Sequence, residues 1–324
     1  MLCQIITIWC NLRNDISLMS HFNFCFHNTN TEILHHCSSN ETDWIFYGKE
    51  LNKRTFINYQ KKLDIKLVII NFWTIDKYKV VSIKGLITET AISLAYKLGW
   101  DVAPLINIPD LKKPGLLILD MDSTAIQIEC IDEIAKIAYR NNFVKKITKS
   151  AMKGEIDFVR SLKNRVEMLK GVKESVLKQV LDTLPLTSGL IELVENLKLF
   201  NWEVAIISSG FKYYASYLEK KLNLVESIAN DLEIEDGQLT GKLVGKIVDS
   251  KYKLNSLKKI SNKLNIALEQ TIAIGDGYND LLMIKSAGLG IAYKANYYVN
   301  KQVIFKIINS DLMGVFCILS STIY

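Results

Sequence analysis

Short apolar runs alternate with stretches of helical periodicity from residue 115 to the end of the chain. The apolar runs, which we expect to be buried strands, are 115–119, 204–208, 271–275 and 289–292. Helices are predicted at 131–139, 189–199, 212–222, 250–264 and 280–287, with a strand pair around Gly237. Strands that alternate with helices favour a parallel, doubly wound sheet with right-handed crossovers. We therefore predict an α/β fold that carries a helix-rich, charged insert at about 142–182.

A proline-containing stretch separates this part of the chain from the residues before it. Three of the four prolines fall within 104–114, which we predict to be a linker. Residues 1–103 then form a small α+β domain without a catalytic constellation, and 115–324 a second domain. The apolar runs and the helical pattern of the first domain are 66–73, 78–85 and 88–100.

The composition excludes several classes of protein. A length of 324 residues suggests two domains, and 49% hydrophobic with 23% charged residues is ordinary for a globular protein. The net charge of +6 is mild and no run of five like charges occurs, so nucleic acid is not an expected partner. No apolar run approaches the roughly 18 residues that cross a bilayer. The apolar N-terminus also lacks the basic leader of a signal peptide.

The six cysteines indicate a reducing compartment. They form no C-x-x-C pair, and their spacing suggests no disulfide framework. Free thiols are typical of the cytoplasm, which is the predicted location. They are Cys3, Cys10, Cys25, Cys37, Cys130 and Cys317.

The predicted insert is locally basic. Between Arg140 and Lys178 there are eleven Lys or Arg residues and four Asp or Glu residues. This bias indicates either a solvated helical face or a lid that attracts an anionic substrate. As a lid, the insert is expected to close on the substrate and to exclude bulk water.

Polar clusters follow three of the apolar runs directly. Ligands of doubly wound sheets bind at the carboxyl ends of the strands, so these clusters mark the predicted site. The clusters are Asp120 with Asp122, Ser208-Ser209-Gly210, and Asp276 with Asn279 and Asp280.

The residue types in these clusters suit phosphoryl chemistry. Asp120 and Asp122 lie two apart at a strand end and point to the same side, so a hard cation such as Mg²⁺ is expected nearby. One acid can attack phosphorus while the other handles the leaving-group proton. Asp276 and Asp280 either complete the metal site or belong to a turn that feeds a helix N-cap. Ser208 at a helix start suits an anion.

Histidine is absent from residues 115–324, because all four histidines, His21, His27, His35 and His36, lie in the first domain. Acid–base work in the second domain must therefore fall to carboxylates, which excludes a Ser-His-Asp mechanism there. No ligands accompany His35 and His36 at zinc spacing. Lys253 is either the cation that meets the phosphate or a surface lysine.

The segment 120–124, Ser208, Lys253 and the segment 275–280, in this order, resemble the four motifs of the haloacid dehalogenase-like phosphatases. The longer string 120–135 is similar to that of the phosphoserine phosphatases within this family. The similarity extends from about residue 101 to near the C-terminus. Weaker similarity at 44–48 and 59–63 resembles the ACT-like N-terminal domain of the bacterial enzymes.

The resemblance implies roles for the matching residues. Asp120 would be the nucleophile that takes the phosphoryl group, and Asp122 would protonate the leaving serine oxygen and then activate water. Mg²⁺ would be held by Asp120, the backbone carbonyl of Asp122 and Asp276, with Asp280 in support. The phosphate would be held by Ser208, Ser209, Gly210, Lys253 and Asn279.

The resemblance further implies O-phosphoserine as the small-molecule substrate, in the last step of serine biosynthesis. Glu129 would bind its amino group, and Phe158 and Arg165 of the insert would close over it. Arg165 would grip the carboxylate in a bidentate pair. Without the resemblance, the favoured interpretations are that Glu129 is an acid at a helix N-terminus and that Arg165 is an exposed helix residue.

Two residues depart from the family pattern. The second motif is usually Ser-Gly-Gly-Phe, and here Ser209 replaces the first glycine. Its Cβ is expected to crowd the phosphate or to restrict the backbone. Tyr278 stands where the fourth motif usually carries a small residue, and is expected to narrow the site or to pack under the insert.

Several functional hypotheses stay open at this point. The first is a phosphoserine phosphatase, and the second is a related phosphatase of another small phosphomonoester. A signalling receiver is disfavoured, because receivers lack both the second aspartate and the helical insert. The fourth is a decayed phosphatase that acts as a binding protein, suggested by Ser209 and Tyr278. A homodimer and a ligand of the first domain are also left open.

Overall fold

The structure is a computed structural model that describes residues 43–65, 67–140, 144, 147 and 157–324. All four histidines and the cysteines before residue 40 lie outside these residues, as does most of 142–156 in the predicted insert. The two described cysteines, Cys130 and Cys317, are buried free thiols. Among the described helices, none combines the length and apolarity needed to cross a membrane.

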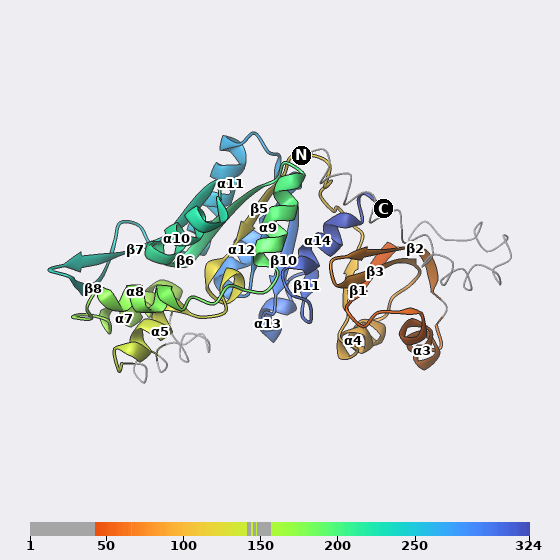
Figure 1. Ribbon diagram of the computed structural model, residues 1–324, viewed down its shortest axis with the longest axis horizontal. Helices are drawn as coiled ribbons and strands as arrows, with labels where there is room; N and C mark the ends of the chain where they lie inside the picture. The colour runs from red at the N-terminus through yellow and green to blue at the C-terminus, as the bar shows by residue number, and fades with distance from the viewer. Residues whose placement is uncertain (1–42, 66, 141–143, 145–146, 148–156) are drawn as a thin grey trace.

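The first described part is a four-stranded sheet covered by two helices (Figure 1). The strands pair antiparallel in the order β2-β3-β1-β4. A βαββαβ chain in this arrangement is ferredoxin-like, so the expected small α+β region is confirmed, whereas its ACT-like assignment stays a prediction. Its elements are β1 (Asp43–Gly48), α3 (Lys53–Leu63), β2 (Val68–Ile75), β3 (Tyr78–Lys84), α4 (Glu89–Lys97) and β4 (Asp101–Pro104).

Side-chain caps fix the start of each of the two helices in this part. Asn52 forms a capping box with Thr55 at the start of α3, and the Thr88 side chain caps α4. The hydroxyl of Tyr59 donates to the carbonyl of Ala91 and joins the two helices. Aromatic rings fill the space between the helices and the sheet, among them Phe46, Phe56, Tyr59 and Trp100.

The second part is a seven-stranded sheet in the order β11-β10-β9-β5-β6-β7-β8. All neighbours are parallel except the β7–β8 hairpin, so the predicted doubly wound sheet is confirmed. Its strands are β5 (Leu116–Leu119), β6 (Glu203–Phe211), β7 (Glu226–Glu235), β8 (Gln238–Val244), β9 (Thr271–Gly275), β10 (Leu289–Tyr293) and β11 (Phe305–Ile307).

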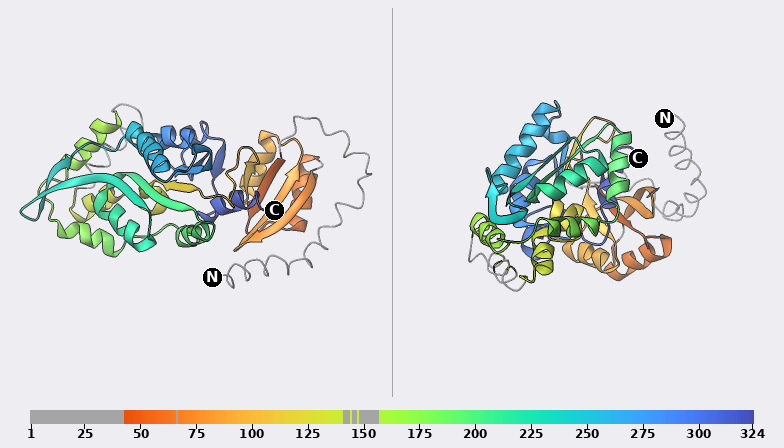
Figure 2. Two further views of the ribbon diagram at one scale, coloured as in Figure 1. Left: turned by 90° about the horizontal axis from the view of Figure 1, so that it is seen from above. Right: turned by 60° about the vertical axis from the view of Figure 1, so that its left-hand side comes forward.

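Helices cover both faces of this sheet (Figures 1 and 2). The main helices are α5 (Cys130–Ile137), α7 (Phe158–Glu167), α8 (Ser175–Asp182), α9 (Leu190–Leu199), α10 (Lys212–Leu222), α11 (Ser250–Lys263), α12 (Leu281–Ser286), α13 (Tyr297–Asn300) and α14 (Met313–Ser320). This part of the chain also has three short helical turns, which are η3 (Met121–Ala125), η4 (Leu268–Gln270) and η5 (Tyr278–Asp280).

The central strand β5 shows why the sheet forms. All four of its residues are buried. Leu116 and Ile118 pack on the face covered by α11, while Leu117 and Leu119 pack on the opposite face, toward α9 and α14. A strand with two buried faces must be apolar throughout, which is the pattern that the sequence carries.

The insert lies at the carboxyl end of the sheet. Helices α7 and α8 gather with α5 beside the far end of the β7–β8 hairpin (Figure 1). The guanidinium of Arg140 donates to the carbonyls of Met168 and Lys170, which ties the entry of the insert to the end of α7.

The two sheets are joined by buried contacts. The carboxylate of Asp101 accepts hydrogen bonds from the backbone N–H groups of Ile308, Asn309 and Ser310. Helix α14 lies between the small sheet and α9 (Figure 1), and the indole of Trp73 donates to its Ser320. Within 104–114, Leu111 is fully buried, so this connection is packed against the fold.

Candidate active site

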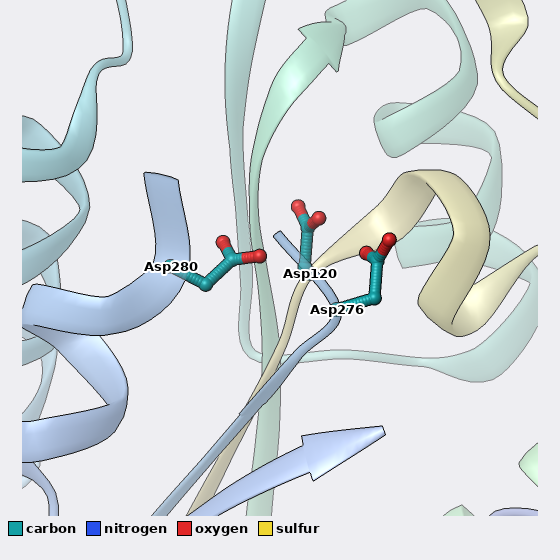
Figure 3. Close-up of side chains that lie close together, drawn as sticks. All are labelled: Asp120, Asp276 and Asp280. Atoms are coloured by element: carbon teal, nitrogen blue, oxygen red, sulfur yellow. The ribbon is translucent and has the colours of Figure 1, made fainter. Parts of the chain in front are cut away.

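Three carboxylates meet at the carboxyl end of the large sheet. Asp120 follows β5, Asp276 follows β9, and Asp280 ends η5. Strands β5 and β9 are parallel neighbours, with Leu119 opposite Ile274, so the residues after them lie side by side. One oxygen of each carboxylate lies within 4.8 Å of the others, and in the view of Figure 3 Asp120 lies between Asp280 and Asp276.

A buried lysine joins two of these acids. Lys253 lies in the first turn of α11, which the Asp249 side chain caps, and it is fully buried. Its Nζ donates to Oδ1 of Asp120 at 2.6 Å and to Oδ1 of Asp280 at 2.6 Å. The interpretation of Lys253 as a surface lysine is therefore wrong. Burial lowers the pKa of Lys253, but the two carboxylates outweigh it, so the pKa is raised and the ammonium stays charged.

The acids around this lysine carry excess negative charge. Burial, followed by the charges of Asp120 and Asp280, raises the pKa of Asp276 well above its usual value. Burial and Asp120 raise the pKa of Asp280 to about 6, against the opposing effect of Lys253. A site of crowded carboxylate oxygens with one ammonium group fits a hard divalent cation.

Asp122 stands apart from this cluster, with its carboxyl against Gly210. A Cβ on Gly210 would lie 2.4 Å from Oδ2 of Asp122, so only glycine allows this approach. The backbone N–H of Cys130 donates to Oδ1 of Asp122 at 3.3 Å. Burial, then Glu129 and then Asp120 raise the pKa of Asp122 well above its usual value. A raised pKa favours the protonated form that a general acid needs.

The turn after Asp120 also positions Glu129. Ser123 has a φ of 57°, a left-handed conformation uncommon for serine. Its hydroxyl donates to Oε1 of Glu129 at 2.8 Å. Burial raises the pKa of Glu129, and this hydrogen bond opposes the rise. Sequence reasoning did not identify Ser123 or Thr124, whose hydroxyl donates to Asp276 at 3.3 Å, although both directly follow the D-x-D pair.

The second motif forms the last residues of β6, where the pairing with β7 is irregular. Ser208 is buried, and its Oγ accepts the backbone N–H of Gly210 at 2.9 Å. The Ser209 hydroxyl donates to the carbonyl of Val248 and accepts a hydrogen bond from the Asn279 amide. Ser209 is not in the left-handed region, so its Cβ causes no strain of that kind, and crowding of the phosphate stays a prediction.

Tyr278 is 72% exposed, whereas the side chain of the neighbouring Asn279 reaches Ser209. This exposure contradicts packing of Tyr278 under the described part of the insert, helices α7 and α8. The alternative expectation, that Tyr278 narrows the site, stays a prediction.

Two site residues predicted in the insert lie on α7. Asp157 caps this helix, which carries the half-buried Phe158 and Arg165. The Nε of Arg165 is buried and has no hydrogen-bond partner among the residues that the structure describes. Its charge lowers the pKa of Glu129, although burial dominates that group. Arg165 is thus a partly buried cation that acts electrostatically on Glu129.

Comparison with family models gives two matches. A model described as haloacid dehalogenase-like hydrolase matches residues 115–288. A second model, described as a domain of unknown function, matches residues 40–104.

Similar proteins extend over most of the chain. The phosphoserine phosphatase of Haemophilus influenzae is 43% identical over 282 residues, which are 87% of this chain and 90% of that protein. The phosphoserine phosphatase of Vibrio cholerae is 40% identical, over 90% of this chain and 89% of that protein. A crystal structure of a probable phosphoserine phosphatase from Vibrio cholerae, in unliganded form, gives a TM-score of 0.80 at 41% identity and covers 87% of each chain.

Proposed function

The chain belongs to the haloacid dehalogenase-like hydrolase family, and we propose that it hydrolyses O-phospho-L-serine to L-serine and phosphate. The observation that carries this proposal is the buried Lys253, which links Asp120 to Asp280 beside Asp276. Two relatives named phosphoserine phosphatase match about nine tenths of the chain, which supports this substrate. The reaction would be the last step of serine biosynthesis, in the cytoplasm.

The resident cation of this proposal is Mg²⁺. Asp120, Asp276 and the backbone carbonyl of Asp122 would hold it, with Asp280 in support through Lys253. When bound, it offsets the negative charge of the phosphate and of the carboxylates around it. The oxygen donors of this cluster suit Mg²⁺ better than softer metals.

Asp120 is the proposed nucleophile. A carboxylate oxygen of Asp120 attacks phosphorus while the bond from phosphorus to the serine oxygen breaks, which leaves an aspartyl-phosphate. Lys253 fixes Asp120 through Oδ1 and brings positive charge to the site of transfer. Its burial means that this charge acts where little water screens it.

Asp122 supplies the protons. Its raised pKa keeps a carboxylic acid available to protonate the departing serine oxygen. Water then attacks the phosphorus of the aspartyl-phosphate, Asp122 accepts the proton of that water, and phosphate leaves as Asp120 is regenerated. The close approach to Gly210 and the N–H of Cys130 hold Asp122 for both steps.

The remaining residues bind the two ends of the substrate. Glu129 would accept hydrogen bonds from the ammonium group. Arg165, whose Nε has no partner within the described part of the chain, would bind the carboxylate, with Phe158 against the serine carbons. The insert that carries Arg165 and Phe158 would close over the bound substrate. The phosphate would be held by Ser208, Ser209, Gly210, Lys253 and Asn279.

The structure offers no support for a decayed enzyme. That hypothesis depended on Ser209 and Tyr278. The Ser209 hydroxyl is bonded to Val248 and Asn279, and Tyr278 is exposed, so neither side chain disrupts the contacts of Lys253 with the acids.

Phosphate release from L-phosphoserine tests the proposal directly. We expect release that requires Mg²⁺, stops in EDTA and is abolished by Asp120→Asn. Asp64→Asn is the matched control, since Asp64 is an exposed acid at the end of helix α3, which covers the small sheet. If p-nitrophenyl phosphate alone were hydrolysed, the phosphatase would stand and the serine substrate would be discarded.

A second variant tests the amino-acid end of the substrate. Arg165→Ala is expected to raise the KM for phosphoserine far more than the KM for p-nitrophenyl phosphate, which lacks a carboxylate. Equal effects on both substrates would count against phosphoserine. D-phosphoserine, assayed beside the L form, measures the stereochemical preference.

A further inference from the structure

The end of β6 leaves the regular ladder of the sheet at the second motif. Strand β6 pairs with β7 up to Ile207 and again at Phe211, with a register shift between them. The residues between, 208–210, therefore lack regular ladder partners and need others for their backbone groups.

The side chain of Asn230 supplies one of these partners, as part of a closed ring of three hydrogen bonds. The amide of Asn230, a buried residue on β7, donates to the carbonyl of Ser209 at 2.7 Å. The Oδ1 of Asn230 accepts the N–H of Val248 at 2.9 Å, and the carbonyl of Val248 accepts the Ser209 hydroxyl at 2.8 Å. Both backbone groups of the buried Val248 are thus satisfied by Asn230 and Ser209.

This ring connects directly to two proposed phosphate ligands. The amide of Asn279 donates to Oγ of Ser209 at 3.2 Å. Val248 immediately precedes Asp249, which caps α11 and whose carbonyl accepts the N–H of Lys253. The Ser209 hydroxyl, at the end of β6, therefore contacts two other segments. It accepts a hydrogen bond from Asn279, in the turn after β9, and donates one to Val248, just before the start of α11.

We propose that the Ser209 hydroxyl is a positioning group, which sets the Asn279 amide and the start of the helix that carries Lys253. The inference rests on the proposed phosphatase function, in which both residues receive the phosphate. It explains why this chain carries serine where the family motif usually has glycine: the added hydroxyl anchors Asn279, so the proposed contact of Ser209 with the phosphate would fall to its backbone.

The experiment compares Ser209→Ala with Ser209→Gly. Both remove the hydroxyl, and only the glycine variant also removes the Cβ. We expect both to lower kcat/KM for phosphoserine and for p-nitrophenyl phosphate by about fivefold to tenfold, the size of one lost hydrogen bond. Inorganic phosphate, titrated calorimetrically with Mg²⁺ present, should bind more weakly by a similar factor. The phosphate titration tests the role of Ser209 independently of the substrate, because it does not require phosphoserine to be hydrolysed.

Two further measurements separate positioning from stability. Ser261→Ala is the control, because the buried Ser261 hydroxyl also donates to a backbone carbonyl, that of Ile266, but lies away from the site, whereas Ser209 is partly buried. It should lower the Tm without changing kcat/KM or phosphate affinity. In an Asn279→Ala background, Ser209→Ala should have much less effect, since its main partner in the site is gone.

Three results would overturn the inference. The first is unchanged phosphate affinity and kcat/KM in Ser209→Ala. The second is full additivity of Ser209→Ala with Asn279→Ala. The third is a glycine variant that equals or exceeds the parent chain, which would mean that the Cβ and not the hydroxyl matters.

Discussion

Lys253 Nζ lies 2.6 Å from Oδ1 of Asp120 and 2.6 Å from Oδ1 of Asp280, in a site where the lysine has no exposed surface. Removal of one partner of a buried ion pair leaves uncompensated charge. Lys253→Met is therefore expected to abolish turnover and to lower the free energy of unfolding by about 3–5 kcal/mol without metal. Urea unfolding in EDTA measures the second effect.

Lys251→Met is the matched control for this variant. Lys251 is exposed two residues earlier on the same helix, so its loss should change neither activity nor stability appreciably. Addition of Mg²⁺ should restore part of the stability of Lys253→Met, because a bound cation replaces some of the lost positive charge. Equal urea midpoints for Lys253→Met and the parent chain would contradict the buried pair.

We expect Ser123 to influence binding at the amino-acid end of the substrate, because its hydroxyl holds Glu129. Without the 2.8 Å hydrogen bond, the Glu129 carboxylate loses a donor that holds it in place. Ser123→Gly removes the hydroxyl and suits the φ of 57°. We expect the KM for phosphoserine to rise by about threefold to tenfold. The KM for p-nitrophenyl phosphate, which has no ammonium group, should stay unchanged, and a parallel rise for both substrates would refute this role.

The same variant should shift the pH dependence of the KM. Burial raises the pKa of Glu129, and the Ser123 hydrogen bond opposes that rise. As pH falls through this raised pKa, Glu129 is protonated and the ammonium group loses its partner. Without Ser123 the pKa rises further, so the KM for phosphoserine should begin to increase at a higher pH than in the parent chain. Identical pH profiles would argue against the link.

The architecture was predictable because it depends on burial along single segments. A strand buried on both faces must be apolar throughout, so β5 and β9 were visible as short runs that ended at Asp120 and Asp276. Helix α14 was not predicted, because it is buried all round and has no amphipathic period. Strand β11, with three residues, is too short to carry a pattern.

The contacts inside the site were less predictable, because their partners lie far apart in the chain. The sequence around Lys253 is that of a polar helix start, so burial and exposure were equally consistent with it. Ser209 meets Val248 across 39 positions, and only the fold reveals that its side chain has a partner. The family resemblance identified these positions, but not which atoms they would contact.

Asp101 ties the small sheet to the loop before α14. Its carboxylate accepts backbone N–H groups from Ile308, Asn309 and the buried Ser310. Asp101→Ala removes every one of these acceptors, and we expect a loss of about 3 kcal/mol in the free energy of unfolding. Asp101→Asn keeps one oxygen and should lose less. Urea unfolding of both variants, beside Asp64→Asn as an exposed control that suits the left-handed backbone at that position, measures the difference.

Asp101 also predicts a pH dependence of stability. Burial raises its pKa in the folded state, against the opposing hydrogen bonds. The folded state therefore binds more protons than the unfolded state between the two pKa values, and this group makes stability fall as pH rises through that window. Asp101→Asn should lack this contribution and show a flatter profile there. The same slope in both proteins would assign the effect to another group.

Asp276 gives a prediction in which the sign of a stability change depends on metal. Burial and the neighbouring Asp120 and Asp280 raise its pKa, which means that its charge is unfavourable in the metal-free fold. Asp276→Asn should therefore raise the Tm in EDTA. In Mg²⁺ the order should reverse, because the parent chain gains binding free energy that the variant has largely lost. Calorimetric scans of both proteins in EDTA and in Mg²⁺ measure the Tm values and show whether their order reverses. If Mg²⁺ raised the Tm of both proteins equally, Asp276 would not be a metal ligand.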